Sequence, residues 1–345
     1  MTSLLPYDPA PLREPCAELD RWRERLDRTG PLARRWEGRL RRDLEAEAVA
    51  ASVGMEQVPV TVDEVRRILA GERPSSVTEV DQSLVLGYRE AMEYVLRRAD
   101  DPGFRWSREL VVALHDRVLG GNYALGAGRL AAGPRWITDR RTGAEVFSPP
   151  PAERVPALVD RACTRMEEGH EHPAMASGWI HVAAAAIHPF RDGNGRAARV
   201  LASLAMYRGG FQRREFTSLE EWWGHHRGDY YSAFSCLGDV FDEAVDVTPF
   251  LLAHVTAQLA QVRALDLRRL ARPAPGVSAR TVPRASGRAS ARDAAADRQA
   301  TNKPPARNAG LHRPPGAGRM SHLPGGQSVP AHLHIRLAPS TASTT

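Results

Sequence analysis

The 345-residue sequence has few cysteines, a single lysine and no long apolar run. Its cysteines, Cys16, Cys163 and Cys236, are far apart and form no C-x-x-C pair, which argues against a disulfide framework and against structural zinc. We therefore expect a reducing compartment, the cytoplasm. No stretch approaches the roughly 18 apolar residues of a membrane span, and the first residues lack the pattern of a signal peptide. We expect a soluble protein without a membrane partner.

The chain has a formal net charge of +6, but this positive excess comes from the C-terminal region alone. Residues 271–345 contain 11 basic and 2 acidic residues, which leaves 36 basic and 39 acidic residues in 1–270. Lys303 is the only lysine in the sequence, against 46 arginines, and this ratio is typical of codon bias in a GC-rich genome. Because the body is close to neutral, its charge argues against a nucleic-acid partner for the core.

Residues 271–345 lack Phe, Trp and Tyr and contain 16 Ala, 10 Pro and 7 Gly. This composition offers no apolar surface to offset the entropy of ordering, so we expect a disordered tail. Two other interpretations stay open. A frame-shifted GC-rich gene would encode the same composition, and a basic tail that binds nucleic acid or a protein would make the chain a regulator.

The rest of the sequence predicts an all-α fold with one β-hairpin. Apolar residues recur at three- and four-residue steps, and Thr61 and Ser107 are candidate N-caps. Residues 135–147 differ, because two short β-favouring runs flank an Arg-Thr-Gly turn. The expected helices are two within 18–50, separated near 29–31, and then 60–71, 81–99, 107–119, 152–168, 175–187, 196–209, 219–236 and 248–263.

The chemistry concentrates in H-P-F-R-D-G-N-G-R-A-A-R, residues 188–199. Its Gly-Asn-Gly at 193–195 can adopt irregular backbone angles, so that successive N–H groups point into one concavity where a helix begins. A helix N-terminus of this kind binds phosphate. Arg196 and Arg199 are three residues apart, which puts them on one helix face with both guanidinium groups toward such an anion.

Two further groups of this segment fit phosphate chemistry. Asp192 supplies a hard carboxylate, and Mg²⁺ is usually bound by one or two carboxylates together with substrate phosphates. His188 can accept a proton from an attacking hydroxyl near neutral pH. The combination predicts nucleotidyl or phosphoryl transfer, and no Walker A loop accompanies it.

Residues 188–199 match every defined position of H-x-F-x-[DE]-G-N-G-R-x-x-R, and the chain therefore resembles the Fic family of protein adenylyltransferases. Supporting similarity lies at 86–94, 125–129 and 246–250. The resemblance implies a helical core with a β-hairpin flap. It also implies transfer of AMP from ATP, with Mg²⁺, to a Ser, Thr or Tyr hydroxyl of a target protein.

The resemblance assigns roles to the residues of the motif. His188 is implied to deprotonate the target hydroxyl, and Asp192 to hold Mg²⁺. The ATP phosphates are implied to contact Gly193, Asn194, Gly195, Arg196 and Arg199, with Arg199 at the terminal phosphate. The flap is implied to align a target segment by strand addition, with Trp136, Ile137 and Val146 at its edge. A hairpin that only closes the core remains the alternative, and Tyr230 and Tyr231 remain open between adenine contact and packing.

The family's inhibitory helix carries [ST]-x-x-x-E-[GN], and residues 52–57 are similar to it. Ser52 and Glu56 occupy the defined positions, whereas Gln57 replaces Gly or Asn. Glu56 is implied to pair with Arg199 and to block the terminal phosphate. A second near match, Ser75 to Glu79, lies beyond the place where that helix should fall.

We expect three regions: residues 1–80 with the inhibitory helix at about 45–57, a Fic catalytic domain at 81–265, and the tail at 271–345. The alternatives are a Fic-fold transferase that uses another nucleotide or phospho donor, and a regulatory binding protein that acts through its basic tail. The second motif arginine, Arg199, favours the AMP orientation. The target and the oligomeric state, including a homo-oligomer, are left open by the sequence.

Overall fold

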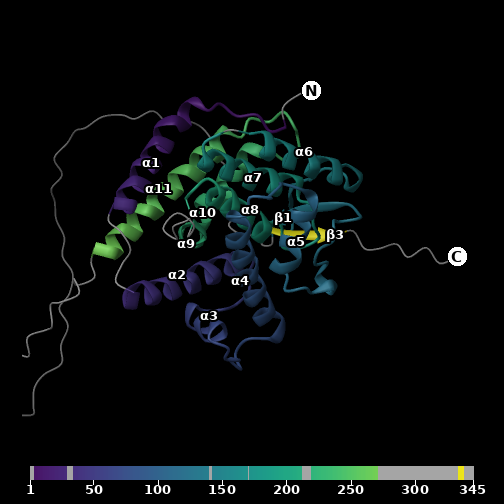
Figure 1. Ribbon diagram of the computed structural model, residues 1–345. Coiled ribbons are helices and arrows are strands. Elements are labelled where there is room, and N and C mark those ends of the chain that lie inside the picture. Colours follow the sequence, from purple (N-terminus) through teal and green to yellow (C-terminus); the bar gives the residue numbers. More distant parts are fainter. Residues whose placement is uncertain are drawn as a thin grey trace, which may run out of the picture. The chain divides into compact units, whose positions relative to one another are not determined.

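The computed structural model describes residues 4–28, 34–139, 142–169, 171–211, 219–270 and 333–337. Residues 1–272 and 328–345 form one compact unit, and a second unit, 273–327, lies outside the described residues. The first unit is mainly helical (Figure 1). Its α-helices are α1 (Arg13–Arg28), α2 (Arg34–Met55), α3 (Val62–Leu69), α4 (Glu79–Ala99), α5 (Arg108–Val118), α6 (Val155–Glu168), α7 (Pro173–Ile187), α8 (Asn194–Arg208), α9 (Leu219–His225), α10 (Arg227–Ala233) and α11 (Thr248–Leu270).

The expected helix starts are confirmed where the sequence offered a capping side chain. Thr61 accepts a hydrogen bond from the Glu64 N–H and forms a capping box with that residue at the start of α3. Ser107 accepts from the Leu110 N–H and begins α5. Each hydroxyl satisfies a main-chain donor that has no partner inside the helix.

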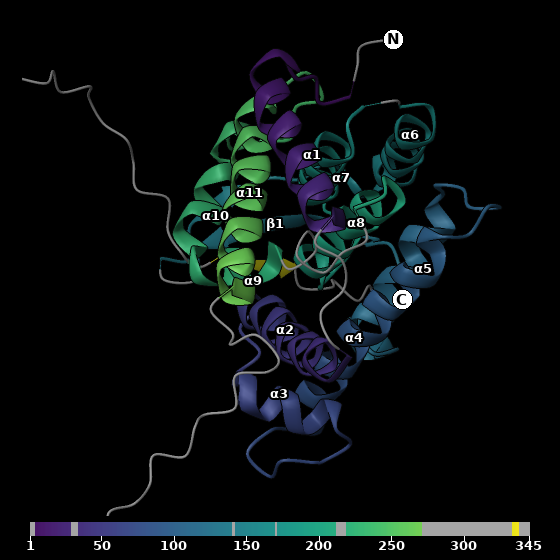
Figure 2. The same ribbon diagram turned by 60° about the vertical axis from the view of Figure 1, so that its left-hand side comes forward.

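The core forms around α7 and α8, which pack against each other. Nearly every residue of α7 is buried, and its small side chains allow close helix contact. At Gly178 a Cβ would lie 3.3 Å from the Leu251 side chain of α11. α1 runs beside α11 in both views (Figures 1 and 2). The loop that joins α7 to α8, residues 188–193, is thus supported by buried helices on both sides.

The predicted hairpin is present as β1 (Arg135–Asp139) and β2 (Glu145–Phe147), which pair antiparallel with Ile137 opposite Phe147. A third strand, β3 (Leu333–Leu337), pairs antiparallel with the other edge of β1. Our expectation of a disordered tail was wrong for these five residues, because the free edge of β1 offers their main chain hydrogen-bond partners. Residues 271–332 and 338–345 lie outside the described residues.

Residues 219–236 were expected to form one helix, and the structure divides them into α9, α10 and a 3-10 helix at Phe234–Leu237. His226 breaks the run, with φ −121° and ψ 46°. α9 packs closely on α2 at Gly224, where a Cβ would lie 2.7 Å from the Ala51 Cβ. The change of direction lets α9 lie against α2 while α10 packs against α11.

Two observations concern the wider chain. Within the described ranges, no helix is sufficiently long and apolar to cross a membrane. The expected inhibitory segment at about 45–57 is the last part of α2 and the turn after it. The boundary at residue 80 stays a prediction, since α2 and α3 lie in the same compact unit as the later helices.

Candidate active site

His188 ends α7 with a left-handed backbone, φ +51°, which is uncommon for a residue with a side chain. Its Nδ1 lies 3.2 Å from the carbonyl oxygen of Ala185. Because a carbonyl oxygen only accepts hydrogen bonds, Nδ1 carries the proton and Nε2 carries the lone pair. Nε2 is buried and has no hydrogen-bond partner in the described part of the chain. The imidazole therefore presents a free proton acceptor.

The surroundings of His188 keep it neutral. Burial lowers its pKa to about 4, the hydrogen bond to Ala185 opposes this, and the positive charge of Arg135 lowers the pKa further. Arg135 is itself buried at the start of β1, and its guanidinium donates to the carbonyl oxygens of Gly133 and Pro150. His188 is thus in its basic form at neutral pH.

An anion cradle lies at the N-terminus of α8. Gly193 caps the helix with φ +73°, a conformation that favours glycine. The N–H groups of the next three residues have no carbonyl acceptor within the helix, so they are free to bind an anion. The Asn194 side chain accepts from the Phe190 N–H at 2.9 Å and donates to the Phe190 carbonyl at 2.8 Å. It holds the loop in shape, and only its main chain faces the cradle.

Asp192 and Arg196 lie beside this cradle. The Asp192 Oδ1 accepts from the Gly193 N–H at 2.5 Å and from the Arg196 guanidinium at 3.2 Å. The Asp192 side chain is 42% exposed, so its carboxylate can still reach a bound cation. Arg196 is buried, and its Nε and Nη1 have no partner among the described residues. These donors suit phosphate oxygens, and a single hard carboxylate next to them suits Mg²⁺.

The described residues contain no group of three or more His, Cys, Asp or Glu side chains that could enclose a metal ion. A cation here would therefore depend on the substrate for most of its ligands. That is the usual arrangement for Mg²⁺ in sites that handle nucleotide phosphates.

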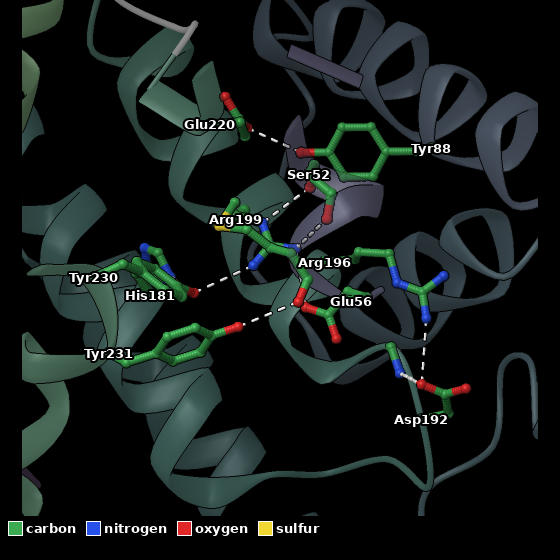
Figure 3. A network of polar contacts seen from close by, with 12 residues as sticks. Ser52, Glu56, Tyr88, His181, Asp192, Arg196, Arg199, Glu220, Tyr230 and Tyr231 are labelled. Atoms are coloured by element: carbon green, nitrogen blue, oxygen red, sulfur yellow. Dashed lines mark hydrogen bonds and ion pairs between the residues drawn. The ribbon is translucent and has the colours of Figure 1, made fainter. Parts of the chain in front are cut away.

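Arg199 is buried one turn further along α8 and binds the end of α2 (Figure 3). Its guanidinium donates to the Ser52 hydroxyl and the Ser52 carbonyl, both at 2.9 Å, and to the Glu56 carboxylate at 3.0 Å. Burial lowers the pKa of Arg199, but its neighbours Tyr230, Glu56 and Tyr88 raise it above its ordinary value. The arginine is charged, and three of its hydrogen bonds go to Ser52 and Glu56, the two residues to which the family resemblance assigns inhibition.

Glu56 also covers the anion cradle. A Cβ on Gly195 would lie 2.2 Å from the Glu56 Oε1, so the carboxylate lies directly against the first turn of α8. A carboxylate is favourable next to the free N–H groups of a helix N-terminus. Gln57, the departure from the family pattern, has φ +65°. The turn after α2 therefore needs the left-handed conformation that Gly or Asn adopts readily.

A buried polar network lies behind Arg199, and the sequence did not reveal it (Figure 3). Arg199 donates to the Tyr230 hydroxyl at 3.2 Å, and that hydroxyl lies 3.1 Å from His181. Tyr88 donates to the buried Glu220 at 2.9 Å, and burial raises the pKa of this carboxyl. These partners are 31 to 132 residues apart in the chain, so only the fold brings them together. Tyr230 thus packs against the motif.

Tyr231 and the flap residues complete the predicted set. The Tyr231 hydroxyl donates to the Met55 carbonyl at 3.2 Å and so fixes the end of α2. Trp136, Ile137 and Val146 are half-buried on β1 and β2, and Ile137 packs against the main core. The structure brings the motif and the α2 end into direct contact, whereas these three flap side chains have no polar contact with either in the described set.

Apart from this network, the sequence analysis also missed His115 of α5. It is fully buried, and its ring stacks on Phe190 with centroids 3.5 Å apart. Its Nε2 lies 2.8 Å from the Asp192 carbonyl oxygen. A polar residue on the buried face of the helix, between Val111 and Val118, was the signal that could have identified it.

Comparison with known proteins agrees with this geometry. Residues 105–206 match the Fic/DOC family. A protein named Protein adenylyltransferase Fic, from Nematostella vectensis, is 30% identical over 135 residues, which are 38% of this chain and 30% of the relative. The matched region thus spans less than a third of that relative.

Solved structures share the fold. A Fic family protein from Desulfovibrio desulfuricans has a TM-score of 0.64 and 22% identity, with 79% of both chains covered. Fic-1 from C. elegans has a TM-score of 0.59 and 20% identity, with 75% of this chain and 73% of that chain covered. Identities this low support the fold alone. The sequence match across α5 to α8 is to the Fic/DOC family, and the fold around it is the one that these Fic proteins share.

Proposed function

We propose that the chain is a protein adenylyltransferase that moves AMP from Mg-ATP to a hydroxyl side chain of a target protein. The observation that carries the proposal is the position of His188: its unpartnered Nε2 lies at the head of a loop whose other end is a helix N-terminus with two buried arginines. A base next to an anion cradle fits attack of a hydroxyl on a phosphate ester. The adenylyltransferase from Nematostella supports the choice of AMP.

In the proposed reaction, the target hydroxyl oxygen attacks the α-phosphorus of ATP while His188 Nε2 takes its proton. A new P–O bond forms to the target, and the bond between the α-phosphorus and the bridging oxygen breaks to release pyrophosphate. The N–H groups at 194–196 and the free donors of Arg196 stabilise charge on the phosphates. When bound at Asp192, Mg²⁺ would neutralise charge on the leaving pyrophosphate.

We further propose that Glu56 inhibits this reaction. Its carboxylate engages Arg199 and lies against Gly195, so a terminal phosphate would compete for the same guanidinium and the same helix turn. Two carboxylate or phosphate anions cannot share this buried arginine at close range without strong repulsion. ATP could then bind only in an orientation that leaves Arg199 to Glu56.

The free edge of β1 supports a docking role for the flap. Five residues of the chain's own C-terminal region pair there, with Trp136 opposite Arg336 and Ile137 opposite Ile335. The edge therefore accepts an extended segment by main-chain hydrogen bonds. A target segment would add to β1 in the same manner, and the strand begins at Arg135, whose positive charge lowers the pKa of His188.

The test compares wild type with Glu56→Gly and His188→Ala in Mg²⁺ and ATP labelled at either the α- or the γ-phosphate, with cell lysate as the source of targets. We expect label from α-labelled ATP to rise with Glu56→Gly. The double variant with His188→Ala should lose at least about 100-fold of that rate, because a general base contributes about that much.

Gln57→Gly serves as the matched control, because it makes the same change to glycine one position later and keeps the carboxylate. It should remain inhibited. Label from γ-labelled ATP alone would favour phosphate transfer instead, and no label from any folded, ATP-binding variant would contradict the proposed function. Equal activity of wild type and Glu56→Gly would remove the inhibitory role alone.

A further inference from the structure

His115 contacts three parts of the motif loop from outside the motif. Its ring lies parallel to Phe190, with an interplanar angle of 1°. Its Nε2 lies 2.8 Å from the Asp192 carbonyl oxygen. A Cβ on Gly193 would lie 3.3 Å from the same nitrogen, so the loop main chain at Gly193 passes close to it. One buried side chain thus touches the residues on both sides of the candidate metal ligand.

The other ring nitrogen of His115 binds a different segment. The Gly128 N–H donates to Nδ1 at 3.2 Å. Gly128 belongs to the turn at 126–129, which precedes the flap and has φ +66° at this residue. The imidazole therefore joins this turn to the motif loop. Its partner in the motif loop, Asp192, lies 77 residues further along the chain.

These two contacts define the protonation state of His115 without ambiguity. A main-chain N–H only donates, so Nδ1 must carry a lone pair, and a carbonyl oxygen only accepts, so Nε2 must carry the proton. A neutral imidazole in this tautomer satisfies both. Other side chains reproduce one end only: Gln can place a donor near the Nε2 position, and Asn can place an acceptor near the Nδ1 position.

We propose that His115 is a positioning residue of the proposed transferase, which fixes the Asp192–Gly193 main chain against the turn before the flap. This inference rests on the proposed function. Because Asp192 Oδ1 also accepts from the Gly193 N–H, any rotation of the 192–193 peptide moves the carboxylate that would hold Mg²⁺. Groups that orient a metal ligand in this way change metal affinity by about 10- to 100-fold when removed.

The test uses His115→Gln, His115→Asn and His115→Phe in the Glu56→Gly background. Gln keeps the donor to Asp192, Asn keeps the acceptor for Gly128, and Phe keeps only the stacking on Phe190. Affinity for Mn²⁺ with ATP is measured by electron paramagnetic resonance, and amide hydrogen exchange is followed for residues 190–196. His254→Gln is the control, since His254 is equally buried on α11 and touches Ser177 instead of the loop.

We expect the Asn and Phe variants to bind Mn²⁺ with ATP about 10-fold more weakly and to exchange the loop amides faster. The Gln variant should stay close to the parent in both respects, and His254→Gln should change neither. Unchanged affinity and protection in His115→Phe, or equal loss in Gln and Phe, would overturn the proposal. If the parent fails to bind Mn²⁺ with ATP, the proposed function fails, and the exchange of residues 190–196 still decides the role of His115.

Discussion

At the scale of single residues, the turn after α2 holds Gln57 in a left-handed conformation that its side chain disfavours. The left-handed conformation costs a residue with a Cβ about 1–2 kcal/mol. Glycine avoids this cost, but it loses more conformational entropy on folding, which offsets part of the gain in stability. We expect Gln57→Gly to stabilise the protein by about 0.5–1 kcal/mol in urea unfolding and to lower residual AMP transfer below that of wild type.

Gln57→Ala separates the two effects, because alanine keeps the Cβ and therefore the strain. It should match wild type in both measurements. Higher activity in Gln57→Gly than in wild type would show that the turn is loosened by glycine, which is the opposite of this account.

The residue scale also shows what a sequence can reveal about a site. His188, Asp192, Arg196 and Arg199 are close in the chain, so their spacing on one loop and one helix was readable. Glu56 was found only through family resemblance, although its contact with Arg199 spans 143 residues. The role of His115 could not be predicted, because a histidine on an apolar helix face does not indicate which main-chain groups the fold will bring to it.

At the scale of elements, α9 packs closely against α2. A Cβ on Gly224 would lie 2.7 Å from Ala51, the residue before Ser52, which is closer than real contacts allow. We expect Gly224→Ala to push α2 away from α9, to weaken the Ser52 and Glu56 contacts with Arg199, and to raise AMP transfer severalfold. Such overpacking costs about 1–3 kcal/mol of stability.

Gly228→Ala is the matched control, because nothing lies within 4 Å of a Cβ at that position of α10. It should leave activity at the wild-type level. If Gly224→Ala folds and remains as inactive as wild type, inhibition does not depend on how α2 packs against α9.

A second prediction at the scale of elements concerns β3. Since it occupies the β1 edge proposed for targets, removal of residues 328–345 should lower KM for a target protein in the Glu56→Gly background and leave KM for ATP unchanged. Removal of 338–345 alone retains β3 and provides the control. The same KM for the target in both shortened proteins would contradict competition at this edge.

Sequence patterns predicted the helices and the hairpin better than they predicted individual contacts. The elements that they missed have identifiable physical reasons. Helix starts with a capping hydroxyl, such as Thr61 and Ser107, were predicted to within a residue or two. The division between α9 and α10 was missed, because it depends on contacts with α2 and α11. β3 was missed because its apolar–polar alternation, Leu-His-Ile-Arg-Leu, is only five residues long and lies in a region rich in Ala, Pro and Gly.

At the scale of the whole molecule, four buried histidines predict acid sensitivity. Burial lowers the pKa of His115 and His188 to about 4 and of His254 to about 3, and it lowers that of His181 well below the ordinary value. Below about pH 6.5 the unfolded chain binds protons that the folded chain excludes. The stabilisation present at pH 7 is therefore lost as the pH falls toward 4.

Each of these histidines contributes up to about 1.4 kcal/mol per pH unit within that window. The measurement is the free energy of unfolding in urea at pH 7, 6 and 5, where most carboxylates still stay ionised. His254→Gln should reduce the slope by removing one titrating group. A constant free energy of unfolding from pH 7 to 5 would be inconsistent with neutral buried histidines.

The pairing of β3 with β1 has a consequence for the solution behaviour of the protein. An uncovered strand edge is a template for any extended chain, including another copy of the same hairpin, and natural proteins protect such edges from aggregation. Here the chain covers the edge with its own main chain. Solubility and the target binding that we propose for the flap therefore depend on the same edge of β1, because an edge that can pair with a target segment can also pair with another copy of the protein when β3 is absent.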